Sequence, residues 1–118
     1  MIADALILTI TREWITLSSK GLLCVIHIRE VRISAFVQEH IWTKHHVIPE
    51  EVEEACCADP FVLRGRERSI VVYGRTEAGR YLVVFLYPHP EGQGIFRLAT
   101  ARDMEQAERR RYQRSKGR

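Results

Sequence analysis

SIVVYGRTEAGRYLVVFLYP, residues 69–88, predicts two apolar strands joined by a tight turn. Ile70–Tyr73 is rich in β-branched residues, and Tyr81–Tyr87 is apolar at every position, which is typical of a central strand. Between them, Glu77–Arg80 predicts a hairpin turn in which Gly79 takes a positive φ. The rest of the fold is expected to pack around this hairpin.

Helices are expected on both sides of the hairpin in the sequence. The first spans residues 36–46, where apolar side chains recur at steps of three and four. The second begins at Pro49, which suits a first helical turn, and ends before Pro60. The third begins at Asp103, which we expect to be its N-cap, and continues to Tyr112.

Further strands complete the predicted pattern. Leu22–Ile33 is rich in aliphatic and β-branched residues, and shorter strands are expected at 61–63 and 95–101. Residues 1–21 fit either short strands or a helix, and the sequence does not decide between them. The last residues, 113–118, are expected to fray.

The order of these elements predicts an α+β fold. A small antiparallel sheet of about four to five strands is expected, with two helices on its N-terminal side and one C-terminal helix. An antiparallel meander with the helices on one face is the natural packing for this order.

The composition indicates an ordinary globular protein of one domain. The chain has 118 residues, of which 46% are hydrophobic and 28% are charged. No run of about 18 apolar residues is present, so we expect no membrane-spanning segment. The three cysteines follow no disulfide or metal-binding spacing, and no phosphate-binding glycine loop is present. We therefore expect a cytoplasmic protein without a metal or a cofactor.

The charges are segregated along the chain, although the net charge is only +3. Five acids and no base lie between Pro49 and Asp59, whereas eight bases and three acids lie between Arg97 and Arg118. Such segregation favours a polyanion or an acidic partner, but two solvated helix faces would give the same pattern.

Six short segments share the order and spacing of one known family. They are IWTKHHV at 41–47, PEEVEE at 49–54, DP at 59–60, YGRT followed by GR within 73–80, RLATAR at 97–102 and ERRRY at 108–112. Together they resemble the BrnT family of toxins, over roughly residues 28–114. Each segment alone is weak, and the resemblance depends on all six being in register.

The resemblance implies a RelE-like fold and a metal-independent ribonuclease toxin of a type II toxin–antitoxin system, with RNA as its substrate. It also implies a partner, a ribbon-helix-helix antitoxin of the BrnA type, with a heterotetramer as one expected assembly. The family has no counterpart to residues 1–25, so these are either a start assigned too far upstream or an added hairpin or arm. Residues 26–114 would then form the toxin domain, with 115–118 as a tail.

Cleaving RNA without a metal needs a base for the 2′-hydroxyl, a cation for the phosphate and an acid for the leaving 5′-oxygen. Arg75 is the first catalytic candidate, because it is a charged residue at the end of an apolar strand and its planar guanidinium matches a phosphate. Lys44 could hold the phosphate, His45 could act as acid or base, and Glu54 could be a base or an orienting partner.

Three more arginines are expected to bind RNA: Arg80, Arg97 and Arg102. Each candidate also has a structural alternative, such as a surface ion pair between Arg75 and Glu77 or a solvated acidic face for Glu54. Ile33-Ser34 stands where the family has Trp-Asp. This departure favours the other function that we consider, a degenerate, non-catalytic RNA- or protein-binding module of the same fold.

Overall fold

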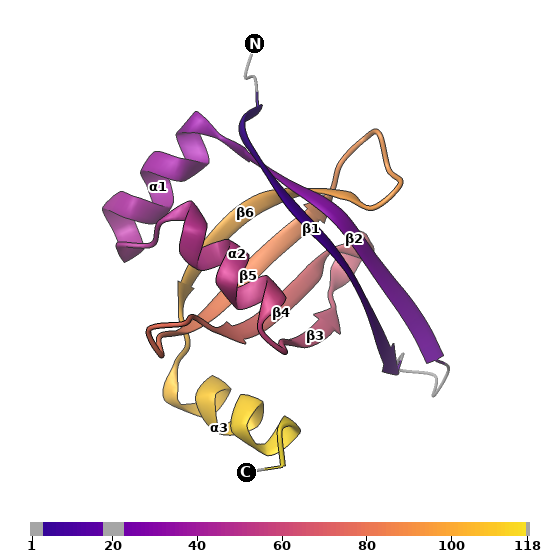
Figure 1. Ribbon diagram of the computed structural model, residues 1–118, viewed down its shortest axis with the longest axis vertical. Helices are drawn as coiled ribbons and strands as arrows, with labels where there is room; N and C mark the ends of the chain where they lie inside the picture. Colours follow the sequence, from indigo (N-terminus) through magenta and orange to yellow (C-terminus); the bar gives the residue numbers. More distant parts are fainter. Residues whose placement is uncertain (1–3, 18–22, 118) are drawn as a thin grey trace.

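The computed structural model describes residues 4–17 and 23–117 and has an α+β fold, as predicted (Figure 1). One six-stranded sheet has the strand order β1-β2-β6-β5-β4-β3. Its elements along the chain are β1 (Asp4–Leu17), β2 (Leu23–Ser34), α1 (Ala35–His45), α2 (Pro49–Cys57), β3 (Phe61–Arg64), a 3-10 turn (Arg66–Arg68), β4 (Ile70–Arg75), β5 (Tyr81–Pro88), β6 (Ile95–Asp103) and α3 (Gln106–Ser115).

The sheet is mixed, which corrects the prediction of a purely antiparallel sheet, and it has six strands where about four to five were expected. β2 runs parallel to β6 over Glu30–Arg32, and every other neighbouring pair is antiparallel. The backbone N–H groups of Arg29 and Glu30 donate to the carbonyl of Gly94, at 2.8 and 3.2 Å. These bonds join the β1–β2 pair to the edge of β6, and β1 is the strand that the five predicted ones did not include.

The segment that the sequence left undecided forms β1. Its described residues pair antiparallel with β2, and the side chains of Leu8 and Ile10 are buried in the core. Residues 1–3 and 18–22 lie outside the described part of the chain. The boundary expected at residue 25 falls within β2, so the sheet is continuous across it.

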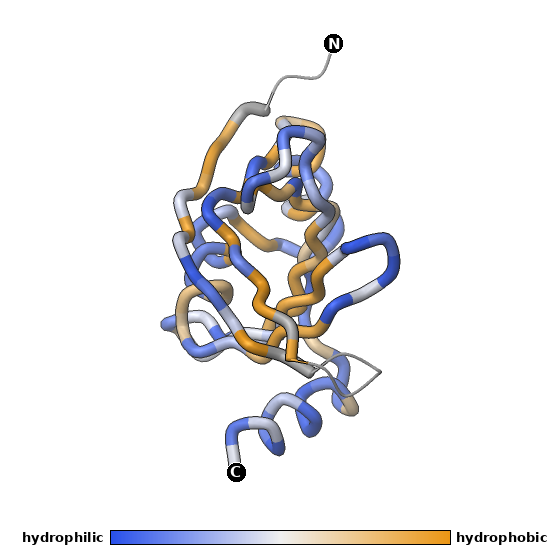
Figure 2. Tube along the Cα trace, turned by 90° about the vertical axis from the view of Figure 1, so that its right-hand side faces the viewer, coloured by the Kyte–Doolittle hydropathy of each residue, from blue (hydrophilic) through white to orange (hydrophobic). Residues whose placement is uncertain are grey.

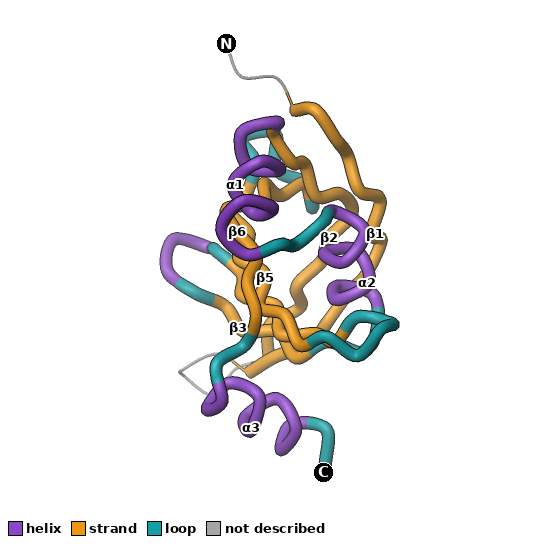
Figure 3. Tube along the Cα trace, turned by 90° about the vertical axis from the view of Figure 1, so that its left-hand side faces the viewer, coloured by secondary structure: helices purple, strands orange, loops and turns teal. Residues whose placement is uncertain are grey.

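The helices lie on both faces of the sheet, which corrects the prediction that they share one face. The sheet curls so that β1 approaches β3, and α2 lies across its inner face, where Val52 and Ala55 pack in the same core as Val72 and Val84 (Figure 1). The outer face is covered in part by α3, because Tyr112 of this helix packs with a second buried cluster. Figure 3 shows α3 at one end of the molecule. β5 is apolar on both faces, and each face therefore needs its own cover.

The third helix begins later than predicted. Asp103 ends β6 and forms an ion pair with Arg80, and the N-cap is Glu105 instead. The Glu108 side chain accepts the backbone N–H of Glu105 at 2.8 Å, which satisfies one of the free donors at the helix start. The helix also continues to Ser115, beyond the expected end at Tyr112. Figure 2 shows α3 as a mainly hydrophilic helix at one end of the molecule.

Candidate functional site

Two arginines contact one tyrosine at the end of the sheet next to α3. Arg75 is the last residue of β4 and pairs in register with Tyr81, the first residue of β5. The guanidinium carbon of Arg75 lies 5.3 Å from the centre of the Tyr81 ring. That of Arg109, on α3, lies 4.4 Å from the same ring. These three residues are called the Arg75–Tyr81–Arg109 cluster below.

The tight turn between β4 and β5 places Arg75 opposite Tyr81. The N–H of Thr76 donates to the carbonyl of Arg80 at 2.8 Å, and Gly79 has a φ of +93°, which confirms its predicted positive φ. Glu54 of α2 accepts the backbone N–H of Glu77 at 3.1 Å. This contact ties the turn to α2, so Glu54 acts as a positioning group in the structure.

The pKa of Tyr81 is lowered from its ordinary value of 10.0. The largest cause is a hydrogen bond with the side chain of Gln113, and the positive charges of Arg75 and Arg109 act in the same direction. The cluster therefore favours the phenolate form of Tyr81 more than water does.

The phenol borders an open recess of about 320 Å³. Its lining comes from the turn, the end of β6 and α3, namely Gly79, Arg80, Tyr81, Asp103, Met104 and Arg109. Arg75 and Arg109 are both exposed to solvent, and neither forms an ion pair within the part of the chain that the structure describes. A small anion could therefore reach each guanidinium group, although only Arg109 lines the recess.

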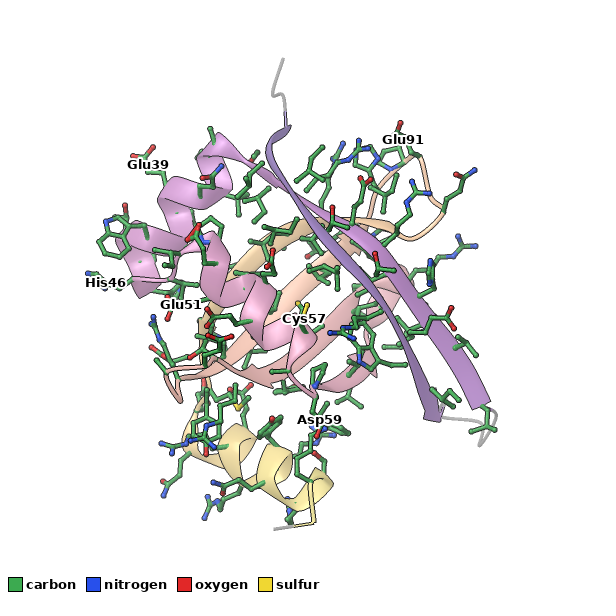
Figure 4. All side chains as sticks on the ribbon, in the orientation of Figure 1. Glu39, His46, Glu51, Cys57, Asp59 and Glu91 are labelled. Atoms are coloured by element: carbon green, nitrogen blue, oxygen red, sulfur yellow. The ribbon has the colours of Figure 1, made fainter. Side chains whose placement is uncertain are left out.

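Arg80, which the sequence suggested as an RNA-binding residue, is occupied by protein groups. Its guanidinium donates to both carboxylate oxygens of Asp103, at 2.7 and 3.1 Å, and to Glu51 at 3.2 Å. It also donates to the carbonyl oxygens of His45 and His46, at 2.6 and 2.8 Å. Figure 4 labels Glu51 and His46, which lie at the same end of the molecule. These contacts favour a structural role, and RNA binding by Arg80 stays a prediction.

Arg102 and Arg97 both lie on β6 but differ in their contacts. Arg102 forms a two-pronged ion pair with Glu108, at 2.8 and 3.0 Å, and its guanidinium carbon lies 5.4 Å from the ring centre of Phe85. Arg97 is exposed and pairs in register with Tyr87. At about 3.4 Å per residue, the two arginines are roughly 17 Å apart along the strand.

Lys44 and His45 lie at the end of α1, apart from the Arg75–Tyr81–Arg109 cluster. Arg80 connects the two regions, because it precedes Tyr81 in the chain and binds the backbone of His45. Burial lowers the pKa of His45, and the charges of His40 and Arg102 lower it further, which favours the neutral imidazole. Lys44 is exposed to solvent.

Of the seven predicted site residues, the structure gathers Arg75, Arg80 and Glu54 around the β4–β5 turn, with Arg102 and His45 bordering it. Arg97 lies farther along β6, and Lys44 lies in the last turn of α1. The sequence-based prediction missed Tyr81, which it assigned to an apolar strand, and it treated Arg109 only as one of the eight bases between Arg97 and Arg118. The register of the β4–β5 hairpin was the available signal for Tyr81, since it pairs this residue with Arg75.

No group of three or more His, Cys, Asp or Glu side chains in residues 4–17 and 23–117 is arranged to hold a metal ion. Cys56 is fully buried, and burial raises its pKa to about 12, so it is not a reactive thiolate. Within the same residues, none of the helices has the length and apolar character to cross a membrane.

Comparisons with family models, with curated proteins and with solved structures give no match to this chain. The chain is therefore classed by its own fold and candidate site. The chain is a small α+β protein with two exposed arginines against one tyrosine at the end of a curled sheet.

We expect the protein to lose stability in acid. Arg80 lowers the pKa of Asp103, and Arg102 lowers the pKa of Glu108, from ordinary values of 3.8 and 4.5. The unfolded chain therefore takes up protons at a higher pH than the folded chain does. The stabilisation is complete above these ordinary values and is lost as the pH falls through the lower folded values.

Urea unfolding followed between pH 7 and pH 3 checks this expectation. In wild type, the free energy of unfolding should decrease as the pH falls below about 4.5. The Asp103→Asn, Glu108→Gln double variant should be less stable at pH 7 and should lose less stability in acid. Equal pH dependence in the two proteins would mean that these ion pairs do not stabilise the fold.

Proposed function

We propose that the chain is a metal-independent endoribonuclease and the toxin of a type II toxin–antitoxin system. The observation that carries this proposal is the contact of Arg75 and Arg109 with the single phenol of Tyr81, beside an open recess. A phosphodiester needs cationic donors and a base close together, and this cluster supplies both.

In the proposed reaction, the phenolate oxygen of Tyr81 takes the proton of a 2′-hydroxyl group. The resulting 2′-oxygen attacks the adjacent phosphorus, and the bond from phosphorus to the 5′-oxygen breaks. Arg75 and Arg109 stabilise the negative charge that grows on the phosphate oxygens. The leaving 5′-oxygen takes a proton, for which solvent serves because the cluster is open. The products are a 2′,3′-cyclic phosphate and a 5′-hydroxyl end.

The other catalytic candidates take supporting roles in this proposal. Glu54 holds the β4–β5 turn through the N–H of Glu77 and so positions Arg75. Lys44 and His45 lie beyond the Arg80 contacts, where they can bind the substrate strand next to the cleaved bond. The chain's own residues and solvent take every role in this mechanism, with no metal or cofactor in any step.

The biological role rests on the resemblance to the BrnT family. A toxin of this class acts in the cytoplasm, blocks translation and is neutralised by a ribbon-helix-helix antitoxin of the BrnA type. The exposed arginines of α3, which include Arg110, Arg111 and Arg114, suit an acidic segment of such a partner. A heterotetramer of two toxins and two antitoxins is the proposed assembly.

A second candidate function is a non-catalytic RNA-binding module. The observation that favours it is the Ile33-Ser34 pair, which stands where the BrnT family has Trp-Asp. Such a module would bind RNA with a strong salt dependence and leave it intact.

Expression in bacteria tests the toxin proposal. Wild type should arrest growth, and co-expression of a ribbon-helix-helix protein from the adjacent gene should relieve the arrest. Arg75→Ala should abolish the arrest while the protein remains folded, because Arg75 is exposed and makes no ion pair in the described part of the chain. Normal growth with wild type at high protein levels would count against a toxin, and full toxicity of Arg75→Ala would reject this site.

A further inference from the structure

Three aromatic residues of β5 lie on the outer face of the sheet. Side chains alternate along a strand, so Tyr81, Phe85 and Tyr87 share the face opposite to the main core. Val83 lies between them and is buried with Tyr112 of α3 in the second cluster. Phe85 is partly exposed, and Tyr87 is 53% exposed. On this outer face, Tyr81 therefore precedes the residue that α3 covers, Val83, and Phe85 and Tyr87 follow it.

Each of these aromatic residues has an arginine beside it. Arg75 and Arg109 contact Tyr81, and Arg102 lies over Phe85 at 5.4 Å. On the neighbouring strand, Arg97 is directly opposite Tyr87. We call Tyr81, Phe85, Tyr87, Arg97 and Arg102 the aromatic strip.

The unpaired charge along the aromatic strip is positive. Glu108 is paired with Arg102, and at the other end Glu91 is paired with Arg32, which lies next to Arg97. Arg97 forms no ion pair with any of the described residues. A strip of this kind complements a chain that has flat apolar rings and a negative backbone.

We propose that the aromatic strip binds single-stranded RNA and leads it to the Arg75–Tyr81–Arg109 cluster, an inference that rests on the proposed function. Phe85 and Tyr87 are about 7 Å apart at 3.4 Å per residue, and aromatic residues on a sheet face stack about two bases in this way, whereas α3 packs over the strand between them and Tyr81. Only unpaired bases can lie flat on the rings, so the ligand is a single strand and not a duplex.

The direct test is a binding measurement that does not depend on cleavage. The probe is a fluorescently labelled single-stranded oligoribonucleotide with methylated 2′-hydroxyls, which lack the attacking group, and the readout is fluorescence anisotropy. Tyr87→Ala should weaken binding about tenfold, and Tyr87→Phe should bind as wild type, because the stacking ring remains. Arg97→Ala should weaken binding and reduce the slope of log affinity against log salt by about one.

Matched controls use residues away from the aromatic strip. Trp42 of α1 is an equally exposed aromatic residue, at 54%, and Arg12 of β1 is an exposed arginine. Trp42→Ala and Arg12→Ala should bind the probe as wild type does. If they weaken binding as much as Tyr87→Ala and Arg97→Ala do, the aromatic strip has no special role and the inference is overturned.

The outcomes separate this inference from the proposed function. Probe binding that depends on Tyr87 and Arg97, with no cleavage of ordinary RNA, would support the aromatic strip and reject the ribonuclease. Cleavage of ordinary RNA by wild type, together with normal probe binding by Tyr87→Ala and Arg97→Ala, would support the ribonuclease and reject the aromatic strip. If wild type does not bind the probe, the inference fails. It also fails if Tyr87→Ala disrupts only self-association or a protein complex, because the aromatic strip is then a protein-binding surface.

Discussion

Tyr81→Phe is expected to lower the rate of RNA cleavage by about 10²- to 10⁴-fold, the usual contribution of a positioned base. The substitution removes only the phenolic oxygen and keeps the ring against which Arg75 and Arg109 lie. Initial rates on a single-stranded RNA substrate, measured in EDTA across a range of pH, check the expectation. The matched control is Tyr73→Phe, which removes the same atom from a buried tyrosine of β4 and should keep the wild-type rate.

The pH dependence of the same rates gives an independent readout. Wild-type activity should rise with pH as Tyr81 ionises, with a midpoint below the ordinary phenol value of 10.0. Arg109→Ala should move the midpoint upward, because it removes one of the positive charges that lower the pKa of Tyr81. A wild-type rate in Tyr81→Phe would show that the phenol takes no proton in the reaction.

The second large effect is expected at Gly74, the residue before Arg75 on β4. A Cβ atom there would overlap the carbonyl oxygen of Ala55 and come within 2.7 Å of its carbonyl carbon. Both atoms belong to the backbone of α2, so the helix would have to move away from the sheet. Gly74→Ala is therefore expected to lower the free energy of unfolding by about 3 kcal/mol or more.

Urea unfolding of Gly74→Ala and of a matched glycine variant measures this loss. Gly92 has a φ of +67° and nothing within 4 Å of an added Cβ, so Gly92→Ala should show only the conformational effect, about 1 kcal/mol. Should both variants lose the same small amount, the close packing of β4 on α2 would not be a main source of stability. Loss of structure would also displace Arg75, so activity should fall with stability in Gly74→Ala.

Local patterns predicted most of the elements because each has a nearby physical cause. The apolar run of Tyr81–Tyr87, the glycine at 79 and Pro49 indicated β5, its turn and the start of α2, and the structure has all three. The pairing of β2 with β6 joins residues distant in sequence and depends on the bonds to Gly94, which no local pattern encodes. The prediction of an antiparallel sheet failed for that reason.

The candidate site was harder to predict because residue type alone does not reveal a partner. Arg80 and Arg102 could not be told from Arg97 by sequence, yet carboxylates 103 and 108 engage the first two and leave the third open. The apolar sequence around Tyr81 gave no sign of a site residue, because its contact with Arg109 joins β5 to α3, which are distant in sequence. Asp103 was taken for a helix cap for a related reason, since its partner Arg80 lies across the sheet.

The central claim is that Tyr81 of β5 cuts a phosphodiester without a metal, together with Arg75 of β4 and Arg109 of α3, which both contact its ring. The most direct measurement is to incubate the folded protein with single-stranded RNA in EDTA and to identify the new chain ends. We predict 2′,3′-cyclic phosphate and 5′-hydroxyl ends with wild type, and intact RNA with Arg75→Ala. RNA that stays intact with wild type after prolonged incubation, or that is cut equally by Arg75→Ala, would contradict the claim.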